Sequence, residues 1–329
     1  MLKKLYSAFV LVTLLCAASL LAVARPADRQ LLAQLPPADV IAAIDLQRLQ
    51  SDTIPAFSNL DQNLATQLNR AMEDFQRETG IDPRVFEQAA VGFRYKGAAG
   101  PEQFVLLLQG RFNAADLIET GFAAAQKKNA KVSRETRNYE GRTVFLIGNA
   151  SQKADERREA VAALDGNTLA FGNFGAVRGA MDARLGRARV DESLVTLAAG
   201  APDALFSFAG VAPADLTTGL TVESGDKVID MARAIRRFAG SVTTRGLEVE
   251  AKVSVFTETA AQASDIVSSL NGLRLLFGSS FRAGGAAGKK DASQLKALLN
   301  RVQINANDAE VQVRLSLSET ELRSLLRIF

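Results

Sequence analysis

The chain has 329 residues, of which 47% are hydrophobic and 23% are charged, and its formal net charge is +3. This composition is typical of a globular protein with one large or two medium domains, and it excludes a disordered chain and a strongly basic nucleic-acid-binding protein. The sequence has no His and a single Cys, Cys16. It therefore excludes imidazole-activated nucleophiles, imidazole metal ligands and intramolecular disulfides.

The first 24 residues have the pattern of a bacterial secretory signal peptide. Lys3 and Lys4 form a positive start, residues 9–21 are apolar, and Ala22-Val23-Ala24 is a small-x-small cleavage site. We expect cleavage after Ala24 and export to the periplasm or the cell exterior. The alternative is an uncleaved N-terminal anchor, because residues 5–24 are just long enough to span a bilayer. We expect no transmembrane span after cleavage.

Alternating and helical patterns predict the elements of the first half. Strands are expected at 39–46, 89–95 and 103–112, with an amphipathic helix at 64–75, a short helix that starts at Pro83, and a long helix capped by Asn113. Two hairpins follow, 132–139 with 142–147 and 160–164 with 168–171, and a helix at 174–185 ends at Gly186. Residues 187–202 contain the expected boundary between the halves.

The second half repeats this order. We expect a strand at 204–211, then a helix whose face holds Val228, Ala232, Ile235 and Phe238 and which Gly240 ends, then strands at 242–245 and 247–256. A helix capped by Thr257 runs to about residue 277, and residues 279–290 form a Gly/Ala-rich flexible segment. A hairpin at 302–306 and 311–317 precedes a last helix, which begins with the capping box Ser318-Glu319-Thr320-Glu321.

The shared order predicts an α+β fold of two similar units, each a mainly antiparallel sheet with helices packed on one face. The units are residues 25–192 and 193–329. An internal duplication would make the strands at 104–112 and 247–256 equivalent, together with the helices that follow them. Coincidence is the alternative, because such orders are common in α+β proteins.

The leader, the Leu35-Pro36-Pro37-Ala38-Asp39 approach to the first strand, the duplicated layout and the ending at 298–326 resemble an uncharacterised family of secreted bacterial proteins. The resemblance covers most of the mature chain. It implies export and a duplicated α+β unit, but no reaction, because that family has no known function.

Two short motifs invite a catalytic interpretation. Residues 284–290 resemble a phosphate-binding loop, but the glycines are one residue too close and Asp291 stands where Ser or Thr would bind magnesium. Ser293 and Lys296 match S-x-x-K, but the partner motifs S-x-N and K-T-G are absent. Paired carboxylates such as Glu248 and Glu250 remain the other route to catalysis. We expect no catalytic residue, cofactor or metal.

A polar sheet face in the second half is the candidate binding surface. Its strands bury alternate residues and present polar ones on the other side, as an antiparallel sheet can. The candidate residues are Glu248, Glu250, Lys252, Glu310, Gln312 and Arg314. The groove where this face meets the first half belongs to the same candidate, and an idle solvated face is the alternative. In the first half, residues 105–108 are apolar on both sides, which predicts a strand covered on both faces.

These observations predict an exported, non-catalytic protein that binds or scaffolds in the bacterial cell envelope. Basic runs at 127–142 and 178–189 could meet an envelope protein or an anionic surface, and they lack the interleaved aromatic residues that suit nucleic acid. One alternative is a hydrolase that uses carboxylates or the Ser293–Lys296 pair. The other is a carrier of an apolar ligand, which needs a sizeable apolar cavity.

Overall fold

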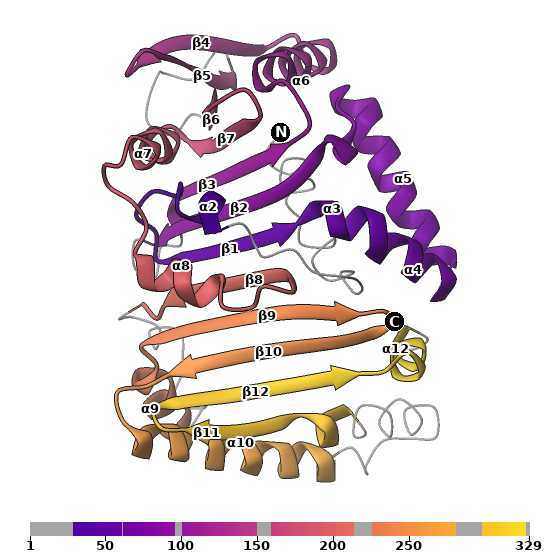
Figure 1. The fold of residues 1–329 in the computed structure, drawn as a ribbon, viewed down its shortest axis with the longest axis vertical. Helices are drawn as coiled ribbons and strands as arrows, with labels where there is room; N and C mark the ends of the chain where they lie inside the picture. The colour runs from indigo at the N-terminus through magenta and orange to yellow at the C-terminus, as the bar shows by residue number, and fades with distance from the viewer. Residues whose placement is uncertain are drawn as a thin grey trace.

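The computed structural model describes residues 29–60, 62–95, 101–149, 159–213, 226–280 and 298–326 (Figure 1). The predicted signal peptide, the motif at 284–290 and the Ser293–Lys296 pair lie outside the described residues, as does most of the segment at 279–290.

A single twelve-stranded sheet forms the body of the described chain, and its strand pairs are antiparallel (Figure 1). The strand order is β11-β12-β10-β9-β8-β1-β2-β3-β7-β6-β5-β4. The strands are β1 Val40–Asp45, β2 Phe86–Tyr95, β3 Pro101–Gly110, β4 Val132–Tyr139, β5 Arg142–Asn149, β6 Glu159–Ala163, β7 Thr168–Asn173, β8 Ala204–Val211, β9 Arg237–Arg245, β10 Glu248–Phe256, β11 Gln303–Asn307 and β12 Glu310–Leu317. The predicted α+β class with antiparallel strands is confirmed, and both halves contribute to one continuous sheet.

The strand order is similar on the two sides of the central β1–β8 pair. β1, β2, β3, β7 and β6 follow one another on one side, and β8, β9, β10, β12 and β11 follow on the other. β3 and β10 thus hold equivalent positions, and each precedes a long helix, α6 (Ala114–Lys128) or α10 (Ala260–Ser280). A duplication predicts this equivalence. The duplication itself stays a prediction, since the β4–β5 hairpin has no counterpart among the described strands of the second half.

Three helices pack on the face of the sheet that is toward the viewer in Figure 1, which we call the front face. They are α2 (Arg29–Leu32), α7 (Phe174–Arg184) and α8 (Glu192–Ala198). Beneath them, Leu35, Ile41 and Leu107 are completely buried in the largest hydrophobic cluster. Because full burial of such a side chain stabilises a fold by about 1.5–3 kcal/mol, this layer is the main core of the first half.

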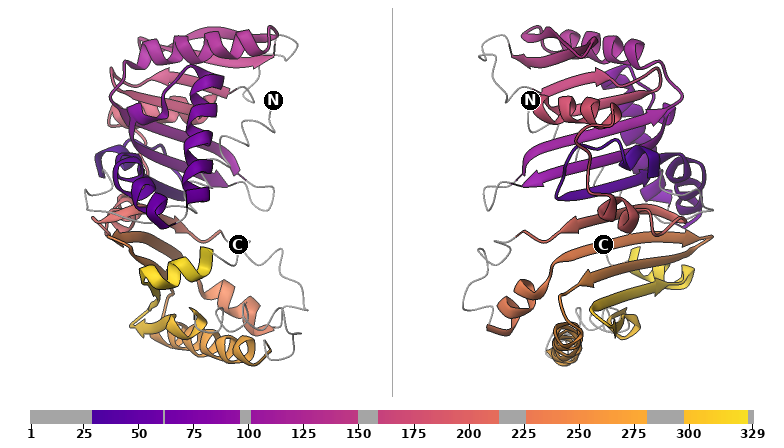
Figure 2. Two further views of the ribbon diagram at one scale, coloured as in Figure 1. Left: turned by 90° about the vertical axis from the view of Figure 1, so that its right-hand side faces the viewer. Right: turned by 60° about the vertical axis from the view of Figure 1, so that its left-hand side comes forward.

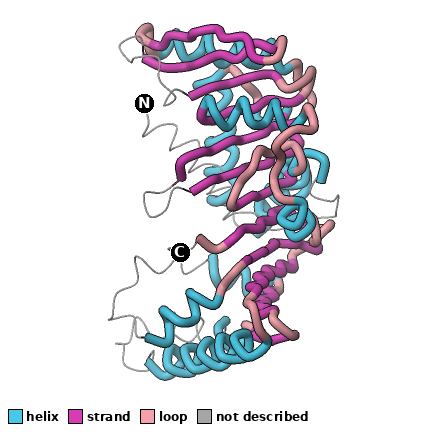
Figure 3. The backbone as a smooth tube through the Cα atoms, turned by 90° about the vertical axis from the view of Figure 1, so that its left-hand side faces the viewer, coloured by secondary structure: helices cyan, strands magenta, loops and turns pink. Residues whose placement is uncertain are grey.

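On the opposite, back face, the described helices pack toward the two ends of the sheet (Figures 2 and 3). At one end α6 packs on β4 and β6 and α5 (Gln62–Thr79) packs on α6; at the other, α10 packs on β11 and β12 and α9 (Asp226–Ala234) packs on α10. Further short helices in the described ranges are α3 Leu46–Arg48, a π-helix Leu49–Thr53, α4 Ile54–Leu60, a 3-10 helix Pro83–Val85 and α12 Glu319–Leu326. Helices therefore lie on both faces of the sheet, whereas the sequence analysis placed them on one face of each unit.

Three rows of apolar residues cross the back face, one residue from each strand in turn, and we call them the apolar rows. Leu108 at one end and Val255 and Val313 at the other pack against the clusters of the end helices. The first is Phe104, Phe93, Val40, Gly210, Phe238 and Val255; the second is Leu106, Val91, Ala42, Phe208, Gly240, Val253 and Val313; the third is Leu108, Ala89, Ile44, Phe206, Val242, Ala251 and Leu315. Most of these side chains are only partly buried, and Val253 is 37% exposed although it lies in the middle of its strand.

The burial of β3 differs between the two faces of the sheet. Val105 and Leu107 point to the front face and are 1% and 0% exposed. Leu106 and Leu108 belong to the apolar rows on the back face and are only partly buried. The expectation that this strand is covered on both faces therefore holds fully for the front face alone.

Two local predictions need correction. Phe238 and Gly240 lie in β9, and the preceding helix α9 already ends at Ala234. The sequence around Phe238 fits two patterns: helical spacing with the residues before it, and strand alternation with Gly240 and Val242 after it. The pairing of β9 with β8 and β10 favours the strand. Helix α10 is capped by Thr259, not by Thr257: Thr259 Oγ1 accepts from Gln262 N, and Gln262 Oε1 accepts from Thr259 N.

Candidate functional site

The six polar residues expected on one sheet face do share the front face of the second half. Lys252 pairs with Arg314 across β10 and β12, Ser254 pairs with Gln312, and Phe256 pairs with Glu310. Residues two apart on a strand point the same way, so Glu248 and Glu250 lie on this face as well. The described helices of the front face pack on the first half and on β8 and β9, so β10, β11 and β12 keep this polar face open.

Two of the carboxylates of the polar face contact neighbouring side chains. Arg314 Nε lies 3.5 Å from Glu250 Oε1, and Gln312 Nε2 donates to Glu310 Oε1 at 3.0 Å. The Arg314–Glu250 pair is exposed, so it contributes at most about 1 kcal/mol to stability. The two cations Lys252 and Arg314 stand opposite each other, an arrangement that costs stability and that an anionic partner would relieve.

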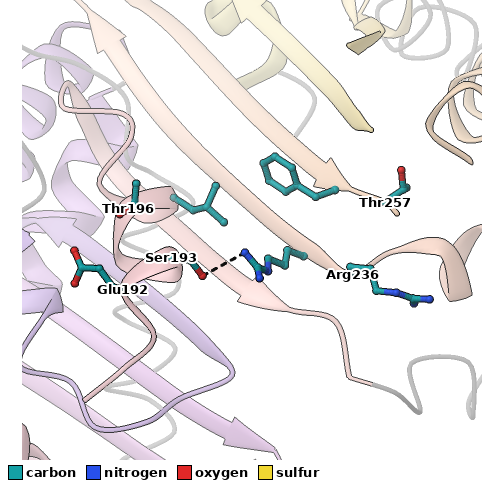
Figure 4. A pocket seen from close by; sticks show the side chains of 8 residues that line it. Glu192, Ser193, Thr196, Arg236 and Thr257 are labelled. Carbon is teal, nitrogen blue, oxygen red and sulfur yellow. Dashed lines mark hydrogen bonds between the residues drawn. The ribbon is translucent and has the colours of Figure 1, made fainter. Parts of the chain in front are cut away.

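A groove lies where the polar face meets the first half, between α8 and the ends of β9 and β10 (Figure 4). Its volume is about 690 Å³. Leu197 and Phe256 supply an apolar surface, both of them packed against the front-face core. Thr257 is buried, and its Oγ1 lies within hydrogen-bond distance of the carbonyls of Thr259 and Ala309. The groove therefore has an apolar floor with polar groups at its rim.

Helix α8 was missed by the sequence analysis, which assigned residues 187–202 to a boundary, and the predicted division at 192/193 falls inside it. Its start is fixed by Asp191, whose side chain accepts a hydrogen bond from Ser193 N at 2.7 Å. Leu194, Val195 and Ala198 are buried against β1, β8 and β9. An N-cap Asp before apolar residues at helical spacing was the available signal. The helix brings Glu192, Ser193 and Thr196 to the groove.

Two of the charged side chains in the groove, Glu192 and Arg236, have ion-pair partners, whereas Arg237 has a hydroxyl partner. Glu192 pairs with Arg29, and Arg236 donates to Glu258 Oε1 at 2.8 Å. This hydrogen bond from Arg236 lowers the pKa of Glu258. Arg237 makes no ion pair within the described part of the chain; its Nη1 donates to Ser193 Oγ at 3.3 Å (Figure 4). The groove thus offers a cation that a bound anion can use.

Asp191, the N-cap residue of α8, directly precedes Glu192 of the groove. Hydrogen bonds from the side chain and the backbone of Ser193 lower the pKa of Asp191, and the charge of Arg237 adds a smaller contribution in the same direction. Asp191 therefore remains ionised at neutral pH, and its negative charge opposes that of Arg237.

A second, smaller hollow lies at the other end of β9 and β10. Its volume is about 370 Å³, and Glu248 and Glu250 of the polar face line it together with Asp203, Arg245 and Arg301. The polar face is thus bounded by a hollow at each end of these two strands. Charges of both signs meet in the smaller hollow, so it has no clear preference for a cation or an anion.

Two carboxylates of the polar face have partners: Glu250 is engaged by Arg314, and Glu310 by Gln312. The part of the chain that the structure describes has no group of three or more acidic, His or Cys side chains placed to hold a metal ion.

No known protein family matches the chain, and no curated protein matches it. Among solved structures, crystal forms I, III and IV of the Treponema pallidum protein TP0453 are similar to it, with TM-scores of 0.43, 0.46 and 0.42 and sequence identities of 10%, 10% and 12%. The alignments cover 90%, 94% and 92% of this chain and 96%, 100% and 97% of the other. Likeness at this level carries no information on function.

Within the described ranges, no helix has both the length and the apolar character that crossing a membrane requires.

Proposed function

We propose that the protein is exported to the bacterial cell envelope and acts there as a non-catalytic binding protein, with the polar face and its adjoining groove as the binding surface. The predicted signal peptide supports export, and the absence of His and of mature Cys from the sequence supports a role without nucleophilic or metal chemistry. The partner is an envelope protein or surface with exposed anionic groups.

The observation that carries this proposal is the continuity between the groove and the polar face. Arg237 in the groove makes no ion pair among the described residues, and Lys252 and Arg314 face each other on β10 and β12, where Glu250 pairs with Arg314. Leu197 and Phe256 add an apolar area of the kind found at the centre of interfaces, with the charges at the rim. A partner that joins an apolar group to an anionic one fits both parts of this surface.

Site-specific photo-crosslinking in the native cell tests the proposal. A photoreactive residue at Asn305 lies on the exposed front face of β11, beside Gln312, and should give one dominant adduct. The same residue at Glu73, exposed on α5 at the other side of the molecule, should give none. No adduct at position 305, or the same adducts at both positions, would reject the binding surface.

The triple variant Lys252→Ala, Gln312→Ala and Arg314→Ala tests whether these three side chains bind the partner. It should remove the adduct at position 305 while changing the free energy of unfolding by no more than about 0.5 kcal/mol per site, because these side chains lie at the surface. Retention of the adduct in a stable triple variant would show that these residues do not bind the partner.

A further inference from the structure

The groove between α8 and the ends of β9 and β10 places an available cation beside a small apolar floor. Arg237 is exposed and makes no ion pair within the described part of the chain. Its contact with Ser193 Oγ uses one of the five N–H donors of the guanidinium group (Figure 4). A guanidinium group binds a carboxylate through two parallel hydrogen bonds, so Arg237 is suited to hold one.

The polar and apolar groups of the groove lie within a few Å of each other. Arg237 pairs directly with Phe256 across β9 and β10, which places their Cβ atoms about 4.5–5.5 Å apart. Ser193 and Leu197 are four residues apart on α8 and therefore lie on the same face of this helix. Both walls of the groove thus repeat one arrangement, a polar group next to an apolar one. A ligand that fits it carries its anionic group within a few bonds of its apolar group.

The apolar floor is too small for a long hydrocarbon chain. Leu197 and Phe256 are the two apolar residues that line the groove, and the others are Glu192, Ser193, Thr196, Arg236, Arg237 and Thr257. A chain that extended beyond the floor would remove these polar groups from water without a hydrogen bond, which costs free energy. A polypeptide instead brings amide groups, which the exposed hydroxyl of Thr196 can pair with.

The C-terminal residue of a polypeptide meets these requirements together. Its carboxylate and its side chain are attached to the same carbon atom, so the carboxylate can reach Arg237 while an apolar side chain lies on Leu197 and Phe256. Capture of a C-terminal carboxylate is a recurring mode of peptide recognition. Building on the binding function proposed above, we infer that the groove binds the C-terminal residue of a partner protein, with an apolar side chain and a free carboxylate.

Fluorescence anisotropy with a synthetic peptide tests this inference on the mature chain. The probe is fluorescein-labelled Ser-Gly-Ser-Gly-Ala-Leu with a free C-terminal carboxylate. Wild type should bind it, and the C-terminal amide of the same peptide should bind about tenfold more weakly, because Arg237 loses its charged partner. A probe that ends in Gly should also lose about tenfold, because no side chain covers the floor. Absence of binding, or equal affinity for acid and amide, would overturn the inference.

A variant of Arg237 separates recognition of the carboxylate from the rest of the groove. Arg237→Gln should weaken binding of the acid about tenfold and leave binding of the amide unchanged, a difference that a general loss of structure would not produce. The matched control is Arg245→Gln, at the other end of the same strand, where it lines the smaller hollow. It should bind both probes like wild type. A folded Arg237→Gln that still prefers the acid would contradict the inference.

Competition distinguishes a C-terminal residue from a fatty acid. N-acetyl-leucine should displace the probe, and dodecanoate at the same concentration should not. Displacement by dodecanoate alone would show that the groove takes a hydrocarbon chain. Crosslinking at position 305 tests the binding surface itself, so an adduct there without peptide binding would reject the C-terminal ligand and leave the proposed function standing.

Discussion

The ring of Phe208 occupies the space that a side chain at Gly240 would need: a Cβ at Gly240 would lie 2.5 Å from Phe208 Cε1. The arrangement is reciprocal, since a Cβ at Gly210 would lie 2.5 Å from Phe238 Cζ. Phe208 pairs with Gly240 and Gly210 with Phe238 across β8 and β9, so each strand supplies one ring and one glycine. The glycines are what allow the two rings to lie against the sheet.

Gly240→Ala should therefore destabilise the protein by about 1–3 kcal/mol, because the Phe208 ring has to move out of a packed position. Chemical denaturation measures this change in the free energy of unfolding. Gly92→Ala is the matched control in another strand of the same sheet, where an added Cβ would meet its nearest neighbours at 3.5 Å, an ordinary contact. It should be neutral or stabilising. Equal stability of the two variants would show that the ring adapts without cost.

The position of Gly240 within a strand could not be predicted from the sequence. A Gly after a helical spacing is a reasonable helix stop, and only the position of Phe208 on the adjacent strand explains why Gly is required within β9. The strands with clear alternation, such as β10 and β12, and the hairpin turn at Glu140 and Gly141, both with positive φ, were predictable because their signals are local.

The candidate sites were also predictable only where their signals are local to one segment of the sequence. Alternation along β10 and β12 places Lys252, Gln312 and Arg314 on one face without knowledge of their neighbours. The groove needs α8, at the junction of the two halves, beside Phe256 of the second half, and the apolar rows need strands from both halves in one sheet. Contacts between distant segments of this kind leave no signal in either segment alone.

Asn113 caps α6 as predicted, and its replacement should have a measurable cost. Its Oδ1 accepts from Ala115 N at 3.0 Å and Asp116 N at 3.4 Å. Asn113→Ala should lower the free energy of unfolding by about 1 kcal/mol, because these backbone donors lose their partner. Asn113→Asp retains an acceptor and should be as stable as wild type. A thermal denaturation series in which both variants behave alike would contradict the role of the cap.

Export makes a prediction about the mature N-terminus. Cleavage after Ala24 should leave a chain that begins Arg25-Pro26-Ala27. Ala24→Arg should block processing, because the peptidase requires a small residue there. Mass spectrometry of the protein from the cell envelope measures both. An intact leader on the folded wild-type protein would instead indicate an uncleaved N-terminal anchor.

Glu159 should make stability depend on pH in a defined direction. It begins β6, opposite Ile147 of β5 and Asn173 of β7, and burial raises its pKa above the ordinary value. The folded state therefore favours the neutral carboxyl, whereas the unfolded chain ionises near pH 4.3. Stability is lost as the pH rises from the unfolded pKa through the folded one, and the loss is complete above the folded pKa.

Glu159→Gln removes this loss, because the amide is neutral at every pH. The melting temperature of the variant relative to wild type should rise with pH from below pH 4 upward and become constant above the folded pKa. Glu73→Gln, at an exposed position on α5, is the control for the replacement of a Glu by Gln at the surface. A Glu159→Gln variant whose difference from wild type is independent of pH would show that Glu159 ionises freely in the folded protein.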